Sequence, residues 1–116
     1  MKRSVLVVDD EEDVREALRD LLEQYGYKVL AAPNGREALN ILRGGDPPGF
    51  VLLDLIMPVM NGWEFLDIVS RDKELSRIPL SISTSTPDQA PSDHDVIPKP
   101  IDVDVLLERI RIACGA

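Results

Sequence analysis

Cysteine, positive charge and long apolar runs are all scarce in this 116-residue chain, and each shortage excludes a class of protein. The single Cys114 cannot form an internal disulfide, which favours a reducing cytoplasm over a secreted, disulfide-bonded scaffold. With 13 basic and 21 acidic residues the net charge is −8, which argues against direct nucleic-acid binding. No apolar stretch approaches the roughly 20 residues of a membrane span, and no signal-peptide pattern opens the chain. We therefore expect one cytoplasmic, globular domain with no membrane partner.

Strand and helix patterns alternate along the whole chain. The valine-rich, non-alternating start is typical of a buried parallel strand, and the other strands follow at intervals. The predicted strands are 2–8, 27–31, 50–53, 79–83 and 95–97. Between them, an apolar stripe predicts a helix over 14–25, and capping residues predict the starts of three more. These three caps are Asn34, Asn61 with Glu64, and Asp102. Regular alternation of this kind indicates a doubly wound parallel α/β sheet.

Acidic side chains stand where two of the predicted strands end. Asp9 and Asp10 close the run Val5–Val8, and Asp54 closes the third strand. In doubly wound sheets, ligands bind at the carboxyl ends of the strands, so we expect these three carboxylates to meet at one edge of the sheet. Carboxylate oxygens are the ligands that a hard divalent cation takes. The pattern predicts a cation site with a nucleophile beside it.

Four short motifs, each at a strand end, carry a resemblance to a known family. They are Asp9-Asp10, Asp54 within the run 54–62, Thr84, and Lys99-Pro100. In this order they resemble the receiver domain of bacterial two-component response regulators, over essentially the whole chain. The resemblance implies a flavodoxin-like, five-stranded receiver fold. It also implies a single receiver domain over 1–116 with no output domain, so that any output passes through a partner protein.

The resemblance also implies a role for each motif residue. Asp54 accepts a phosphoryl group from a histidine kinase or a histidine phosphotransfer protein. Mg²⁺ is held by Asp9, Asp10, Asp54 and the backbone carbonyl of Ile56. Thr84 and Lys99 contact the phosphoryl oxygens, and the Lys99–Pro100 bond is cis. The protein is then a phosphoacceptor regulator that switches partner binding, not an enzyme that turns over small molecules.

The chemistry requires such residues independently of the resemblance. Attack by a carboxylate on a phosphoryl group gathers negative charge, which a cation, a lysine and a hydroxyl donor together stabilise. Three clustered carboxylates repel one another, so we expect at least one carboxyl pKa to be raised before a metal binds. Aspartate is a known nucleophile for phosphoryl groups. The expected product is a labile acyl phosphate on Asp54.

Each residue also has a purely structural interpretation. Asp10 fits the N-cap of the first helix, and it could serve both the cap and the metal. Asp54 alone fits a turn, Thr84 alone fits a β-former at a strand end, and Lys99 alone fits a solvated surface lysine. Trp63 fits a partly buried packing residue near Asp54. Only the occurrence of the motifs together favours the functional interpretation.

The segment between Thr84 and Lys99 departs from the family pattern. It is shorter than a typical receiver needs, and its prolines and missing apolar periodicity argue against a helix. We predict a mobile loop or one short turn over 86–93 in place of the fourth helix. Ser81, Ser83 and Ser85 give the preceding strand a polar face, and we expect the missing helix to leave that face nearly uncovered.

Val96 stands where receivers commonly carry an aromatic residue that rotates when the protein is phosphorylated. We therefore expect the response to be an ordering of the 84–95 segment. The main alternative is a pseudo-receiver, a constitutive interaction module that kept the fold and lost the switch. A phosphohydrolase with an aspartyl intermediate is a weaker alternative, because Ile56 occupies the position of its second acid. A P-loop nucleotide-binding motif is absent from the sequence.

Overall fold

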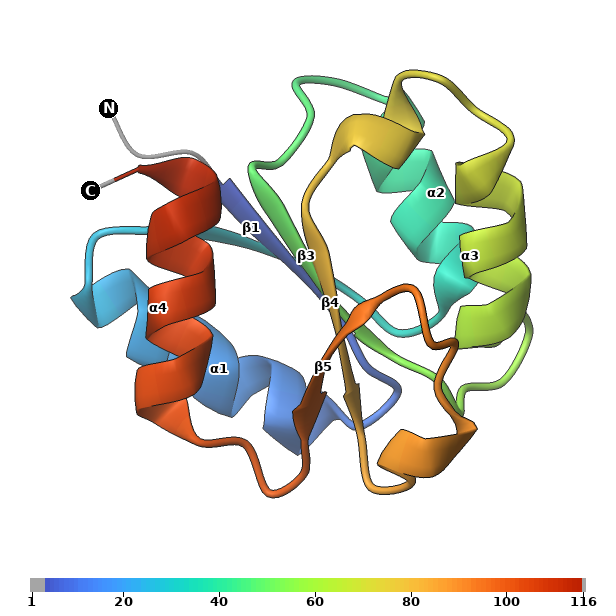
Figure 1. Cartoon of the computed structure of the whole chain (residues 1–116). Helices are drawn as coiled ribbons and strands as arrows, with labels where there is room; N and C mark the ends of the chain where they lie inside the picture. Colours follow the sequence, from blue (N-terminus) through green and yellow to red (C-terminus); the bar gives the residue numbers. More distant parts are fainter. Residues whose placement is uncertain (1–3, 116) are drawn as a thin grey trace.

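A computed structural model describes residues 4–115, which form a three-layer α/β/α fold. Five parallel strands make one sheet, as the alternating pattern predicts, and their order is β2-β1-β3-β4-β5 (Figure 1). The strands are β1 (Ser4–Val8), β2 (Lys28–Ala32), β3 (Phe50–Asp54), β4 (Leu80–Thr84) and β5 (Asp95–Pro98). The helices are α1 (Glu12–Gln24), α2 (Gly35–Arg43), α3 (Gly62–Ser70) and α4 (Val103–Cys114). The predicted first strand begins at residue 2, which lies outside the described residues.

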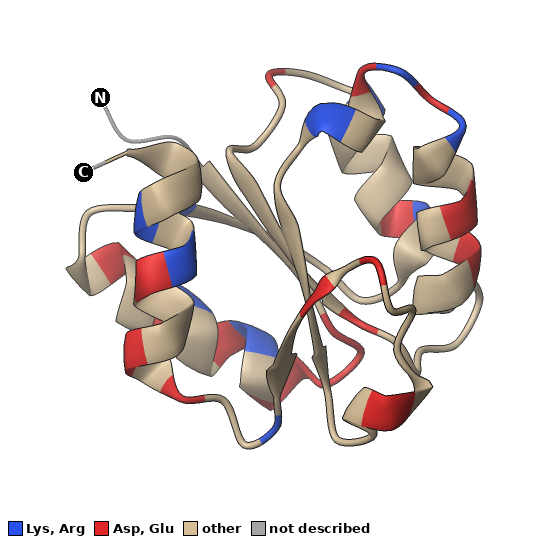
Figure 2. Ribbon diagram, in the orientation of Figure 1, with Lys and Arg blue, Asp and Glu red and all other residues tan. Residues whose placement is uncertain are grey.

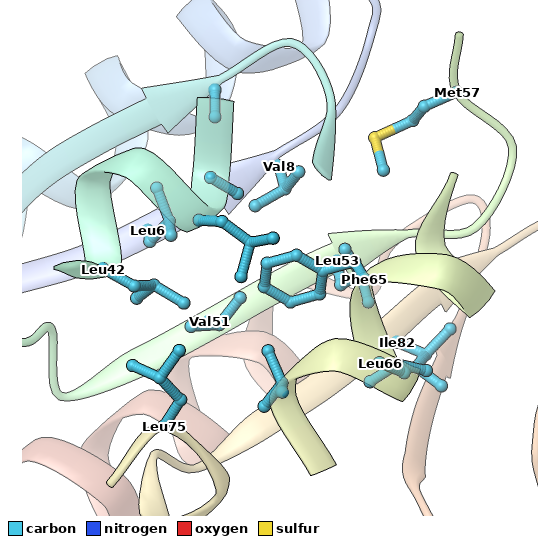
Figure 3. Close-up of a cluster of buried hydrophobic side chains, with 14 of the residues drawn as sticks. Leu6, Val8, Leu42, Val51, Leu53, Met57, Phe65, Leu66, Leu75 and Ile82 are labelled. Atoms are coloured by element: carbon cyan, nitrogen blue, oxygen red, sulfur yellow. The ribbon is translucent and has the colours of Figure 1, made fainter. Parts of the chain in front are cut away.

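Alternate residues of each strand supply the cores on the two faces of the sheet. Leu6 and Val8 of β1 pack on the side of α2 and α3, where Phe65 of α3 is completely buried (Figure 3). Val5 and Val7 point to the opposite face, which α1 and α4 cover (Figure 1). The two faces explain why β1 carries no polar residue between Val5 and Val8. None of the helices within 4–115 has the length and apolar character needed to cross a membrane.

The predicted caps are confirmed at three helices. The Asn34 side chain accepts from the Glu37 amide at 2.9 Å, and Asn61 and Glu64 form a reciprocal capping box. Asp102 accepts from two amides of the first turn of α4. The structural interpretation of Asp10 as the α1 cap is wrong, since the N-cap of α1 is residue 11 and makes no side-chain cap bond.

The apolar stripes predicted on the helices are broader than the faces that are buried. Leu18 and Leu22 are the buried residues of α1, and Leu106 and Ile110 are those of α4. Exposed members of the predicted stripes are Ala17, Tyr25 and Val103.

The predicted loss of the fourth helix is confirmed. Between β4 and β5 the described chain forms only a short 3₁₀ turn, η2 (Pro87–Gln89). A second 3₁₀ turn, η1 (Leu75–Arg77), precedes β4. Ala90, within the connection, and Val96, on β5, are partly buried and pack against the α2 and α3 core.

The expectation that a polar face of β4 is left uncovered is wrong. Ser81 and Ser83 are each 2% exposed, and their respective register neighbours, Leu52 on β3 and Ile97 on β5, belong to the core under α1 and α4. That side of β4 is therefore covered, and Ile82 on the other side is buried as well. Ser81 donates to Asp95 Oδ2 at 2.6 Å, and Arg109 of α4 donates to the same oxygen at 2.9 Å. Ser81 is buried with a polar partner from β5, Asp95, which Arg109 of α4 binds in turn. The Ser83 hydroxyl is buried without a hydrogen-bond partner among the described residues.

Candidate functional site

The first part of the site is the turn between β1 and α1. Asp9 follows β1 and is 4% exposed, whereas Asp10 is exposed. The Glu11 amide donates to Asp9 Oδ1 at 2.9 Å, and the Arg15 guanidinium donates to the Asp9 carbonyl at 2.8 Å. These bonds hold the chain in a tight turn at the carboxyl end of the strand. The buried carboxylate therefore has a fixed position, while its neighbour reaches solvent.

The second part is the end of β3. Asp54 is the last residue of this fully buried strand and is itself 8% exposed. Behind it, the Gly62 amide donates to the Leu55 carbonyl at 2.8 Å, so the start of α3 lies directly against the strand end. A Cβ at Gly62 would lie 2.6 Å from the Asp54 carbonyl oxygen. Glycine is needed here because two backbone segments approach so closely.

The structure brings the three predicted carboxylates together. One oxygen each of Asp9, Asp10 and Asp54 lies within 4.8 Å of the others. Figure 2 shows acidic residues gathered in the loops at the arrowhead end of β1 and β3. The sheet itself causes this convergence, since parallel neighbouring strands end at the same edge. A hard cation with oxygen ligands fits this donor set.

Lys99 reaches the same cluster from the end of β5. Its ammonium lies 3.1 Å from Asp9 Oδ2 and 3.7 Å from Asp54 Oδ1. Its amide donates to the Thr84 carbonyl at 2.9 Å, and the following bond to Pro100 is cis, as the resemblance implies. Burial acts to lower the pKa of Lys99, but the bond to Asp9 and the charges of Asp9 and Asp54 outweigh it and raise that pKa. The lysine therefore stays charged beside the carboxylates.

The pKa of Asp54 is raised, as the clustering predicts, but repulsion is not the main cause. Burial contributes most to the increase and the negative charge of Asp9 adds to it, while the positive charge of Lys99 opposes both. Hydrogen bonds from the backbone amides of Ile56 and Leu55 also act to lower the pKa. Asp54 is thus a desolvated carboxyl group whose ionised form is favoured by the positive charge of Lys99.

Thr84 lies at the end of β4 and is 1% exposed, but it does not contact Asp54 by any hydrogen bond in the described chain. Its hydroxyl oxygen accepts from the Thr86 amide at 3.1 Å and lies 3.2 Å from the Thr86 hydroxyl oxygen. Sequence reasoning missed Thr86. The signal available was the spacing of two threonines at i and i+2, which suits a turn closed by a side-chain hydroxyl.

The loop between β3 and α3 holds the exposed rim of the site. Ile56 is 58% exposed and Val59 is 72% exposed. Val59 has φ of +66°, an outlier for a β-branched residue, and the Met60 amide donates to the Pro58 carbonyl across it at 2.7 Å. The Met60 carbonyl accepts from the amide of Gly35 at 2.9 Å. The loop is therefore pinned to the start of α2.

The sequence profile of the response regulator receiver domain matches residues 5–111. The chain belongs to this family. PilH of Pseudomonas aeruginosa is 34% identical over 115 residues, covering 92% of this chain and 93% of that protein. The polar-differentiation response regulator DivK of Brucella anthropi is 31% identical, with 99% and 98% covered. The response regulator MprA of Mycolicibacterium vanbaalenii is 38% identical, and the chain spans 48% of its length.

Solved receiver structures share the fold. The chemotaxis response regulator CheY4 of Vibrio cholerae superposes with a TM-score of 0.84 at 27% identity, covering 97% of this chain and 99% of that one. The receiver domain of a histidine kinase from Syntrophus aciditrophicus gives a TM-score of 0.83 at 27% identity, with 96% and 89% covered. Receiver domains are signalling modules of two-component systems and not enzymes for small molecules. As a member of this family, the chain is a signalling module.

Proposed function

We propose that this receiver domain is a Mg²⁺-dependent phosphoacceptor in which Asp54 takes a phosphoryl group from a histidine kinase or a histidine phosphotransfer protein. The observation that carries the proposal is the convergence of Asp9, Asp10 and Asp54 within 4.8 Å, with the Lys99 ammonium 3.7 Å from Asp54. A nucleophile, a cation-binding pair and a positive side chain are the parts that phosphoryl transfer to a carboxylate needs.

The Asp54 carboxylate makes the new bond. One of its oxygens attacks phosphorus as the bond from phosphorus to the donor histidine nitrogen breaks, and the nitrogen keeps the electron pair. The Lys99 ammonium is held by Asp9 at 3.1 Å. From this position beside Asp54 it can bind an oxygen of the transferred phosphoryl group. Because Lys99 keeps its proton, it acts as a fixed positive charge. Burial raises the pKa of Asp54, and the positive charge of Lys99 opposes that increase and favours the ionised, nucleophilic form.

The donor set around Asp54 fits Mg²⁺. Asp9, Asp10 and Asp54 supply carboxylate oxygens, and the Ile56 carbonyl in the adjoining loop is the further ligand that we expect. Bound Mg²⁺ would neutralise phosphoryl charge in the transition state. The exposure of Asp10 suits a metal that keeps several water ligands, because Mg²⁺ sheds its hydration reluctantly.

The donor protein needs a surface beside the nucleophile. A groove runs between the first turns of α1 and the β5–α4 loop, and Lys99 lies in its wall. The apolar part of this wall is formed by Val14, Ala17, Leu18, Pro100 and Ile101. A kinase or phosphotransfer helix lying there would bring its histidine toward Asp54. The phosphorylated receiver then acts on an output protein by protein–protein contact.

Intact mass after incubation with Mg²⁺ and acetyl phosphate tests this function. We expect one phosphoryl adduct that is lost with EDTA and in Asp54→Asn. Asp46→Asn serves as the matched control. Asp46 is an exposed aspartate in the loop that precedes β3, whereas Asp54 is at the other end of that strand. It should be phosphorylated like the wild type.

Two results would contradict the proposal. An adduct that persists in Asp54→Asn would place the phosphoryl group elsewhere. An unmodified wild type, with acetyl phosphate and also with phosphoramidate and histidine kinases as donors, would favour the pseudo-receiver, a constitutive interaction module. In that case Mg²⁺ titration would separate a site that still binds the cation from one whose carboxylates do not act together.

A further inference from the structure

We propose that Thr86 is a positioning residue whose hydroxyl competes with the phosphoryl group for the Thr84 proton. When Thr84 turns to the phosphoryl group it releases Thr86, and the 3₁₀ turn η2 carries this change to Trp63. The inference rests on the proposed function, because it requires a phosphoryl group on Asp54. It adds a residue and a route that lie outside the motifs of the phosphoacceptor site.

The direction of the hydrogen bond between the two threonines follows from their burial. Thr84 is 1% exposed, so its hydroxyl proton has no access to solvent. Its oxygen already accepts the Thr86 amide, and within residues 4–115 the Thr86 hydroxyl is the acceptor within reach of its proton. Thr86 is only partly buried, so its own proton can go to water. Either hydroxyl could donate across this contact, and burial favours Thr84 as the donor because buried donors are usually satisfied.

A phosphoryl group on Asp54 offers Thr84 a stronger acceptor. A hydrogen bond to a charged phosphoryl oxygen is roughly twice as strong as one between two neutral hydroxyls. A hydroxyl has a single proton, so Thr84 cannot donate to Thr86 and to the phosphoryl group together. The contact between the two hydroxyls, 3.2 Å long in the described structure, is therefore lost when the phosphoryl group is engaged.

The release of Thr86 reaches Trp63 through the residues of η2 and one hydrogen bond. Thr86 is the N-cap of η2, and its carbonyl accepts the Gln89 amide at 3.0 Å. At the other end of the turn, the Gln89 carbonyl accepts the indole N–H of Trp63 at 3.4 Å. Trp63 is in the first turn of α3 and is 36% exposed. A shift at Thr86 thus alters the cover over a partly exposed aromatic ring beside the site.

Val96 replaces the aromatic residue that commonly responds to phosphorylation on β5, so the route through η2 has no counterpart on that strand. Its side chain is apolar, packs against the α2 and α3 core, and has no group that could hydrogen-bond to a moving Thr84. The connection from β4 to β5 is the segment that begins at Thr84 itself. The movement of one hydroxyl is therefore transmitted along the chain that follows it.

The test uses the phosphoryl mimic beryllium fluoride with Mg²⁺. Fluorine NMR reports its occupancy, and Trp63, the only tryptophan of the chain, reports η2 by its emission. We expect Thr86→Val to bind the mimic about threefold more tightly, because the competing acceptor is gone. Its emission change per bound mimic should fall to about half or less. Thr86→Ser keeps the hydroxyl and should restore both values, and Ser85→Ala removes an exposed neighbouring hydroxyl as the matched control.

The sign of the affinity change separates positioning from a merely structural role. A structural role predicts weaker binding in Thr86→Val, and equal or weaker binding there would overturn the inference. Wild-type emission that stays constant at saturation would also overturn it. Thr86→Ala carries the same expectations if the valine variant fails to fold. If acetyl phosphate modifies Asp54 and either overturning result is found, only this inference is refuted. If no adduct forms, the proposed function falls and this inference falls with it.

Discussion

Two loops at the same edge of the sheet are built in opposite ways. The β3–α3 loop, residues 55–61, is fixed by backbone hydrogen bonds at both ends, from Gly62 to Leu55 at 2.8 Å and from Gly35 to Met60 at 2.9 Å. The β4–β5 connection, residues 85–94, contains one 3₁₀ turn and is joined to its neighbours through side chains. One loop directly follows the nucleophile Asp54 at the end of β3, and the other directly follows Thr84 at the end of β4.

This difference separates the two tasks of a switch. The nucleophile needs a constant position, and backbone bonds supply it because they do not depend on rotamers or charge. A segment that must move needs contacts that are each weak, so that one new hydrogen bond can outweigh them. The shortened β4–β5 connection has contacts of that kind. The following predictions are ordered from the largest expected effect to the smallest.

Gly62→Ala should break the rigid loop. The new Cβ would lie 2.6 Å from the Asp54 carbonyl and 2.7 Å from Leu55 Cα, and neither backbone atom can yield without moving the strand end. We expect the free energy of unfolding to fall by about 2–3 kcal/mol, measured by urea titration. Gly45→Ala is the control, since a Cβ there meets nothing within 4 Å. A stable Gly62→Ala protein, as helix propensity alone would predict, would show that the close approach does not constrain the loop.

Val59→Gly should strengthen the same loop. Val59 has φ of +66°, which costs a β-branched residue roughly 1–3 kcal/mol and costs glycine almost nothing. After the entropy that glycine loses on folding, we expect a gain of about 1 kcal/mol in the free energy of unfolding. Val59→Ala removes the same exposed methyl groups but keeps a Cβ at positive φ, so it should gain less. Equal gains in both variants would show that exposure, and not backbone strain, is the cost.

Acid should destabilise the end of the β4–β5 connection, where Asp95 begins β5. Burial acts to raise the pKa of Asp95, but hydrogen bonds from Ser81 and Arg109 and the charge of Arg109 outweigh it, so that pKa lies below its ordinary value. A lowered folded pKa gives stability that is present above the unfolded pKa, near 3.9, and is lost as the pH falls through the folded value.

The measurement is the stability of the wild type and Asp95→Asn between neutral pH and about pH 3. We expect the wild type to be more stable by about 0.5–1 kcal/mol at neutral pH, a small value because the ion pair is partly exposed. The difference between the two proteins should shrink below about pH 4. A difference that is independent of pH would mean that Asp95 acts through packing and not through its charge.

Trp63→Phe should have the smallest effect on stability. It keeps an aromatic ring and removes one long, exposed hydrogen bond, from the indole N–H to Gln89 at 3.4 Å. We expect a loss of less than about 0.5 kcal/mol, together with faster amide exchange in η2 than in the wild type. Unchanged exchange would show that the indole does not restrain the turn.

Local patterns sufficed for most of the fold. The caps at Asn34, Asn61 and Asp102 are chosen by side chains that bond amides two or three residues away, so sequence alone specifies them. The loss of the fourth helix was predictable for the same reason, since Pro87 and Pro91 act on their own backbone. The covered polar face of β4 was not, because Ser81 is satisfied by Asp95, which Arg109 binds in turn, and both residues are distant from Ser81 in sequence.

The sequence by itself determined which end of the sheet carries the chemistry, because parallel strands place Asp9, Asp10 and Asp54 at one edge whatever the packing above them. Only the tertiary structure decided how these groups interact. The raised pKa of Asp54 comes mainly from burial, the charge of Lys99 reaches it from another strand, and Thr84 bonds Thr86 instead of the site. Burial and distances between strands are properties of the packed chain, which no local pattern encodes.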